Sequence, residues 1–318
     1  MRVGIRVLFV AVCLAEVLCS TGCDSARGRG AVPRDSAAPV LAGSGSGSAS
    51  GLNAGVGGQA GEARAYVGFD RNVYPGDARL AELHRQFAFS GYWLNVPPGE
   101  QRNSWTGRRK RLVEAGFGFL VLANGRLDAE IKRARQRPEE LGRRDGAEAI
   151  AAAGREDFPA QTILFLDQEE GGRLLPEQAA YFFAWTETVA ASHFRPGAYV
   201  SGQLSGDGVG ADGKPLMITT AQDVREQIAA RHLQPVVLWV SQDECPPAPG
   251  CTVAAPRLAD SGTAGATVWQ YAQSPRRPEL TRSCAKTYGA DGLCYAGVTT
   301  DVFLDLNVAD SADPSHGR

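Results

Sequence analysis

Two carboxylates stand two residues apart at the end of an apolar run, in the segment Ile163-Leu164-Phe165-Leu166-Asp167-Gln168-Glu169. Residues two apart on a β-strand share a face, so we expect Asp167 and Glu169 to point into one cleft. Close carboxylates raise one another's pKa, and a carboxyl that keeps its proton near neutral pH can act as a general acid. Hydrolysis of a glycosidic bond needs such an acid and a second carboxylate that stabilises positive charge or supplies a nucleophile.

Other polar residues stand at the ends of other apolar runs. Asp70 lies near the end of the first run and Asp305 near the end of the last, while amides or aromatic rings end several of the others. Flat aromatic rings at the rim of a cleft favour stacking on sugar rings. The predicted site therefore combines the catalytic residues Asp70, Asp167, Glu169 and Asp305 with the substrate-binding residues Tyr92, Asn124, Trp239, Gln270 and Tyr271.

Eight apolar runs of strand length would position these side chains. They cover residues 66–72, 87–95, 117–125, 162–169, 197–202, 235–242, 266–273 and 302–307, with helical patterns at 77–85, 104–115, 176–193 and 219–232. Several runs are apolar on both faces, as in a buried parallel sheet. We expect an α/β fold, a (β/α)₈ TIM-type barrel whose last connections are irregular and loop-rich. The carboxyl ends of all strands then meet at one mouth, which gathers the acids of strands one, four and eight.

Each of these features also has a purely structural explanation. An aspartate at a strand end is often the N-cap of the next helix, and aromatic residues in strands are more often core than binding surface. The segment 206–213 alternates acids with glycines but lacks the ligand set of an EF-hand, so we expect a flexible loop over the rim of the cleft.

Several motifs resemble known families. Gly68-Phe69-Asp70, Phe165-Leu166-Asp167-Gln168-Glu169, Trp269-Gln270-Tyr271 and Asp305-Leu306-Asn307 resemble the glycoside hydrolase family 25 lysozymes. The stretch Asn103-Ser104-Trp105-Thr106-Gly107-Arg108-Arg109 with Ala115-Gly116-Phe117-Gly118 is similar to an exported bacterial glycoside-hydrolase-like domain, domain of unknown function 1906. The resemblance spans nearly all of Tyr66 to Asn307.

This resemblance implies a secreted barrel that cleaves peptidoglycan. It makes Glu169 the general acid, and Asp167 the partner that assists the acetamido group of the substrate or polarises the reacting centre. Asp70 and Asp305 match the aspartates of the first and eighth strands. The sequence departs from the lysozyme pattern at Gln168, where an apolar or aromatic residue usually separates the two acids.

The N-terminus has the pattern of an export signal. Two arginines in the first six residues precede an apolar run over 7–19, which is too short to span a bilayer of ~30 Å. Cys23 follows small residues, as in a lipoprotein cleavage box, so the alternatives are lipidation of Cys23 and ordinary signal cleavage. We expect a signal peptide over 1–23, a disordered Gly/Ser/Ala-rich tether over 24–62, a barrel over 63–310 and a short tail over 311–318.

Four further cysteines form two close pairs late in the chain. Cys245 with Cys251 and Cys284 with Cys294 are expected as local disulfides in an oxidising compartment, periplasmic or extracellular. A four-cysteine zinc site is the alternative, although the usual C-x₂₋₄-C spacing is missing.

Composition excludes some classes of partner. With 33 Lys+Arg, 35 Asp+Glu and a net charge of −2, the chain is no strongly basic nucleic-acid binder. No dinucleotide or phosphate-loop motif follows the first strand, and the histidines show no metal-binding spacing. We expect a monomer without cofactor or metal, attached to a membrane only through a lipid on Cys23. The leading hypothesis is a glycoside hydrolase acting on peptidoglycan or a related cell-wall glycan; the alternatives are a non-catalytic glycan-binding module and an interaction protein on the same fold.

Overall fold

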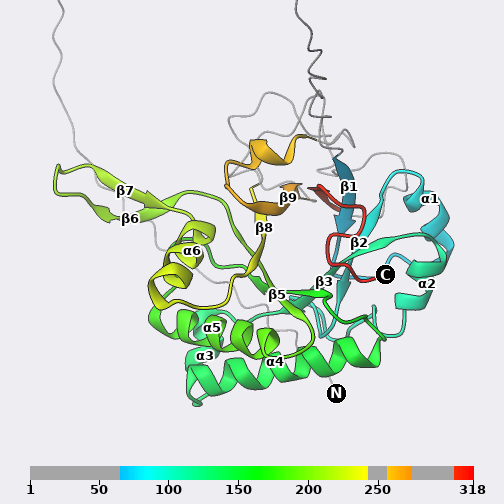
Figure 1. The fold of residues 1–318 in the computed structure, drawn as a ribbon, viewed down its shortest axis with the longest axis horizontal. Coiled ribbons are helices and arrows are strands. Elements are labelled where there is room, and N and C mark those ends of the chain that lie inside the picture. The colour runs from blue at the N-terminus through cyan, green and yellow to red at the C-terminus, as the bar shows by residue number, and fades with distance from the viewer. Residues whose placement is uncertain (1–64, 243–255, 274–303) are drawn as a thin grey trace, which may run out of the picture. The chain divides into compact units, whose positions relative to one another are not determined.

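The computed structural model describes residues 65–242, 256–273 and 304–318, and these form a closed eight-stranded barrel with helices on its outside (Figure 1). The predicted α/β barrel is thereby confirmed. Around the barrel the strands follow the order β1-β10-β9-β8-β5-β4-β3-β2. Their bounds are β1 Tyr66–Asp70, β2 Phe89–Trp93, β3 Gly118–Asn124, β4 Ile163–Gln168, β5 Arg195–Ser201, β8 Val237–Ser241, β9 Ala266–Ala272 and β10 Asp305–Ala309.

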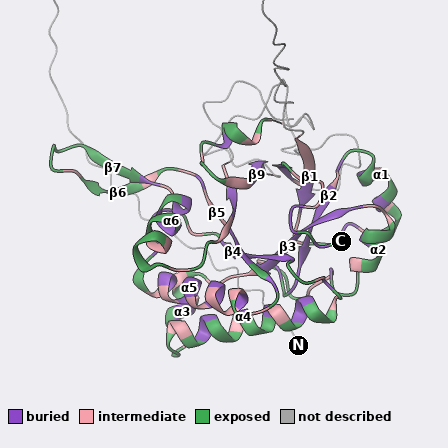
Figure 2. Ribbon diagram, viewed as in Figure 1, coloured by how far each residue is buried: buried purple, intermediate pink, exposed green. Residues whose placement is uncertain are grey.

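The strands are buried because most of their residues are apolar on both faces. β4 is buried at every position, and its inward ring Phe165 packs edge-on against Trp239 of β8. Figure 2 shows the same burial along the barrel strands, whereas the outer faces of the helices are exposed. A sheet covered on both sides needs such continuous apolar runs, which is why these strands were recognisable in the sequence.

One strand runs against the expected direction. β10 pairs antiparallel with both β1 and β9, whereas the other neighbouring strands of the barrel are parallel. Asp305 therefore begins β10 instead of lying near its end, and it pairs in register with Asp70 at the end of β1. The reversal keeps Asp305 at the mouth formed by the carboxyl ends of the parallel strands.

The helices lie outside the barrel and include two that the sequence patterns did not predict. They are α1 Leu80–His84 with the preceding 3₁₀ turn Asp77–Arg79, α2 Arg109–Glu114, α3 Asp128–Arg133, α4 Pro138–Arg155, α5 Pro176–Ala190, α6 Thr220–Arg231 and the 3₁₀ turn Leu258–Ser261. The unpredicted helices are α3 and α4, and the longer of them, α4, begins with a proline, which is favourable at the first helical position. Its buried positions are mostly glycine and alanine, so it packs on α5 without a bulky apolar stripe.

The segment expected as a flexible loop over the cleft is a β-hairpin. β6 Ser205–Val209 pairs antiparallel with β7 Pro215–Ile218, and Figure 1 shows this hairpin projecting beyond α6. Arg173 ties it to the body: its guanidinium binds Asp207 of the hairpin at 2.8 and 2.7 Å and the buried Asp223 of α6 at 2.7 Å. The hairpin therefore has a defined attachment rather than a free course.

The last eight residues, expected as a short tail, pack across the starts of β3 and β4. The Ser315 amide donates to the Phe119 carbonyl at 2.9 Å, and the Ile163 amide donates to the Ser315 carbonyl at 2.8 Å. Arg109 donates to the Gly317 carbonyl at 2.7 Å. This segment supplies hydrogen bonds where β3 and β4 do not yet pair with each other.

Several predictions concern residues outside those that the structure describes. They are the signal peptide and tether over 1–62, Cys23, and the cysteines Cys245, Cys251, Cys284 and Cys294.

Candidate active site at the carboxyl ends of the strands

Three aspartates from three strands lie around one half-buried tyrosine. Asp70 is the last residue of β1, Asp167 is the residue before the last in β4, and Asp305 is the first residue of β10. Burial raises the pKa of the Tyr199 hydroxyl, on β5, well above its usual range, and the negative charges of the three aspartates raise it further. The structure thus brings together the acids that the sequence placed on strands one, four and eight.

Asp70 is held by two amide side chains. Its Oδ1 accepts from Asn307 Nδ2 at 2.7 Å and from Gln270 Nε2 at 3.0 Å. Asn307 is itself fixed, because its Oδ1 accepts from Trp239 Nε1 at 2.9 Å. The neighbouring position on β2 is Gly91, where an added Cβ would lie only 2.7 Å from the Asp70 Cβ. A glycine there leaves the room that the Asp70 side chain occupies.

Tyr199 extends this network and is the site residue that sequence reasoning missed. Its hydroxyl donates to Gln270 Oε1 at 2.7 Å, while Gln270 donates to Asp70. Tyr199 also pairs in register with Asp167 across β4 and β5. The raised pKa keeps the phenol neutral and therefore able to donate. The only signal for Tyr199 in the sequence is a side chain with a polar hydroxyl inside an otherwise apolar strand, at the position that pairs with Asp167.

Asp167 is buried without full hydrogen bonding. Only 4% of it is exposed, and its Oδ1 has no hydrogen-bond partner among the described residues. Burial raises the pKa of this carboxyl well above its usual range, and the negative charges of Glu169 and Asp70 raise it further. A buried carboxylate oxygen without a hydrogen-bond partner is costly, so the folded protein favours the protonated acid here.

Burial also raises the pKa of Asp70 from 3.8 to about 6, against the smaller lowering effect of its bonds from Asn307 and Gln270. The folded state therefore binds more protons than the unfolded state between about pH 4 and pH 6, so stability falls as the pH rises through this window. We expect this group to remove about 2 kcal/mol of unfolding free energy between pH 4 and 7. Asp70→Asn should flatten that decline in urea unfolding at several pH values; an unchanged slope would contradict the shift.

A small cavity of about 160 Å³ opens beside the acids. Asp167 and Glu169 line it together with Asn124, Arg126 and Glu130. Glu169 lies just past the end of β4 and is exposed, unlike Asp167. The D-x-E pair therefore consists of one carboxyl in the barrel interior and one that faces solvent at the cavity.

The predicted substrate-binding residues divide into two groups. Asn124 lines the cavity, and Gln270 belongs to the network around Asp70. Tyr92, Trp239 and Tyr271 are at most 1% exposed. A fully buried ring has no free face for a sugar, so the structure does not support a stacking role for these three aromatics. Trp239 instead orients Asn307 from inside the barrel.

Tyr92 has a different structural task. Its hydroxyl donates to Glu156 Oε2 at 2.6 Å and accepts from the Arg108 amide at 3.3 Å, while its ring packs edge-on against Trp105, Phe119 and Phe158. We expect Tyr92→Phe to lower the unfolding free energy by about 1–2 kcal/mol, since the part-buried hydrogen bond to Glu156 is lost. The affinity for wall glycan, measured by calorimetry, should stay unchanged. Weaker binding by a variant as stable as the parent would contradict this and show that Tyr92 contacts the glycan.

The described residues contain no cluster of three or more His, Cys, Asp or Glu side chains arranged to hold a metal ion. In the same part of the chain, no helix has both the length and the apolar character required to cross a membrane.

Sequence comparison finds no matching protein-family model. No curated protein matches either. Solved structures of similar fold include an uncharacterised B. stearothermophilus protein, which is 20% identical over 77% of this chain and 95% of that chain, with a TM-score of 0.46. They also include the Mycobacterium tuberculosis Tat-secreted protein Rv2525c in complex with HEPES, which is 10% identical over 79% of this chain and 98% of that chain, with a TM-score of 0.44. The Clostridium perfringens spore cortex lytic enzyme SleM is 12% identical over 78% of this chain and 68% of that chain, with a TM-score of 0.45. Likenesses this distant assign no function, which has to come from the chemistry of the site.

Proposed function

We propose that this protein hydrolyses a glycosidic bond in peptidoglycan or a related cell-wall glycan by carboxylate acid catalysis. The observation that carries the proposal is the pair at the end of β4: a buried Asp167 with a raised pKa and an unpartnered Oδ1, beside the exposed Glu169 in one cavity. Two carboxyls in different environments supply the two roles that glycoside hydrolysis needs.

Glu169 is the proposed general acid. Its position at the open cavity allows its carboxyl to reach the oxygen of the leaving sugar, whereas Asp167 lies too deep to do so. Transfer of the proton to that oxygen breaks the bond without expelling an alkoxide. A water molecule then completes the hydrolysis.

Asp167 is proposed to stabilise the charge that develops on the reacting sugar. An acetamido N–H that donates to Asp167 Oδ1 would supply the missing hydrogen bond and favour the anionic carboxylate. Because Asp167 and Glu169 interact, we propose that the proton that Asp167 gives up passes to Glu169. Substrate binding would in this way prepare the acid and the stabilising anion together.

Asp70 and Asp305 are proposed to maintain the negative electrostatic potential around Asp167. The charge of Asp70 helps to raise the Asp167 pKa, and Asp70 is fixed by Asn307 and Gln270. Asp305 is its register partner on β10. These residues position and tune the D-x-E pair without direct contact with the leaving group.

The test is digestion of purified peptidoglycan with the purified protein. We expect new reducing ends, measured colorimetrically, and mass-spectrometric products that differ from the substrate by one water per cut. Binding in a pull-down assay without new reducing ends would instead support a non-catalytic glycan-binding module.

We also propose export of the chain, with residues 1–23 as the signal, 24–62 as a tether and 63–310 as the barrel. Cys23 would carry the lipid anchor, and Cys245–Cys251 and Cys284–Cys294 would form disulfides outside the cytoplasm. The mass of the mature protein, before and after reduction, distinguishes lipidation from simple cleavage and counts the disulfides.

A further inference from the structure

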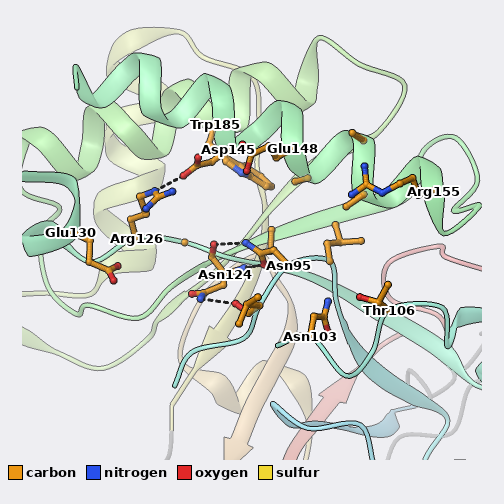
Figure 3. A pocket seen from close by; sticks show the side chains of 17 residues that line it. Asn95, Asn103, Thr106, Asn124, Arg126, Glu130, Asp145, Glu148, Arg155 and Trp185 are labelled. Atoms are coloured by element: carbon orange, nitrogen blue, oxygen red, sulfur yellow. Dashed lines mark hydrogen bonds and ion pairs between the residues drawn. The ribbon is translucent and has the colours of Figure 1, made fainter. Parts of the chain in front are cut away.

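A second cavity of about 540 Å³ adjoins the acid pocket and follows helix α4 (Figure 3). Asn124, Gly125, Arg126 and Glu130 line both cavities, which makes them neighbours at the carboxyl end of β3. From there the larger cavity extends between the segment after β2 and the face of α4 that carries Asp145, Glu148 and Arg155. We name this cavity the α4 groove.

Charged side chains follow one another along the α4 groove. Near the acid pocket, Arg126 binds Asp145 at 2.5 Å. One turn further, the largely exposed Glu148 pairs loosely with Arg144 at 3.7 Å. At the far end, Arg155 is exposed, and its guanidinium has no hydrogen bond or ion pair with any other described residue. Its five N–H donors are therefore free for a ligand.

The walls of the α4 groove fit a narrow polar chain. On α4 the residues between the charges are alanines, including Ala149 and Ala152, which leave room above the helix. The opposite wall carries Asn95, Asn103 and Thr106, all polar (Figure 3). Asn103 is held in place, since it donates to the Trp93 carbonyl at 2.7 Å. Such side chains suit the amide groups of a peptide better than an apolar ligand.

The length of the groove sets the length of that chain. Asp145 and Arg155 are ten residues apart on a helix, so they are separated by about 15 Å along its axis. An extended peptide covers this distance with about four to five residues. Arg155 offers the planar fork that pairs with a carboxylate, whereas Asp145, Glu148 and Glu130 would repel a polyanion.

We propose that the α4 groove binds a peptide branch of the glycan, about four to five residues long, whose terminal carboxylate pairs with Arg155. This proposal rests on the proposed function, because the acid pocket would hold the glycan from which the branch extends. Glu148 lies between the two ends, one turn from Asp145, and provides a carboxylate for an amine on the branch.

Calorimetry on the Glu169→Gln protein tests the proposal without turnover. The probes are a wall tetrasaccharide bearing pentapeptides, the same tetrasaccharide without peptide, and the peptide-bearing form with its terminal carboxylates converted to amides. We expect Arg155→Ala in this background to weaken binding of the first probe about tenfold and to leave the other two unchanged. Arg155→Lys should recover part of the loss, and Arg143→Ala, another exposed arginine of α4, should lose nothing.

Each other outcome overturns the proposal. Equal losses for all three probes would assign Arg155 to the glycan or to the fold, and no loss with any probe, or no binding of any, would leave the groove without this ligand. Failure of the proposed function would give a different result. If the wild-type protein made no new reducing ends but bound the first probe through Arg155, the peptide-binding proposal would stand and the proposed hydrolase activity would be wrong.

Discussion

Glu169→Gln is expected to slow the release of reducing ends from peptidoglycan by about 10²–10⁴-fold, the usual contribution of a positioned general acid. Glutamine keeps the size of the side chain but has no proton of suitable acidity for the leaving oxygen. Because Glu169 is exposed past the end of β4, its replacement should leave the fold intact. The effect should therefore fall on kcat, with little change in KM.

The matched control is Glu114→Gln, which removes another exposed carboxylate, on α2. We expect this variant to retain full activity and the thermal midpoint of the parent. If Glu169→Gln and Glu114→Gln were equally active, the acid would have to be another group, and the assignment of Glu169 would fall. Loss of activity together with a lower melting temperature would also contradict the argument, because it would mark Glu169 as structural.

Gly118→Ala is expected to lower the unfolding free energy by about 3 kcal/mol or more, at the upper end for overpacking. An added Cβ at Gly118 would lie 2.0 Å from the Ala312 carbonyl oxygen and 2.6 Å from the Asp313 Cα. Both are backbone atoms of the C-terminal segment, which is fixed by hydrogen bonds to Phe119 and Ile163. Neither the strand nor the segment can yield without breaking these bonds.

The contrasting variant is Gly154→Ala in the last turn of α4, where an added Cβ meets nothing within 4 Å. There the change should raise stability by about 0.5 kcal/mol, because alanine loses less backbone entropy in a helix. Thermal and urea unfolding of both variants measure the difference. A Gly118→Ala protein as stable as the parent would show that the C-terminal segment does not pack on β3 as described.

The sequence predicted the barrel strands well because a sheet covered on both faces needs long apolar runs. It predicted α4 poorly for the opposite reason. The helix buries Gly142, Gly146 and several alanines against α5, so its contact face consists of small residues rather than of a periodic apolar stripe. Patterns of hydrophobicity reveal where large apolar side chains recur, but they do not reveal where small residues let two helix backbones come close.

The aromatic residues show the same limit at the site. Tyr92 and Tyr271 lie next to the ends of β2 and β9, and Trp239 lies in the middle of β8, but packing buries all three. Tyr199 went unnoticed because its role depends on Gln270, which is 71 positions away in the chain. A strand pattern gives the level of a residue along the barrel, whereas its partners depend on which strands are neighbours.

By itself, the sequence determined the α/β barrel class and the presence of acids at the mouth, since both follow from local runs and from the shared end of parallel strands. Only the tertiary structure decided that β10 runs antiparallel, that Asp305 faces Asp70, and that Asp167 is buried while Glu169 is exposed. These properties depend on barrel closure. Closure joins residues more than two hundred positions apart and sets the burial that shifts their pKa values.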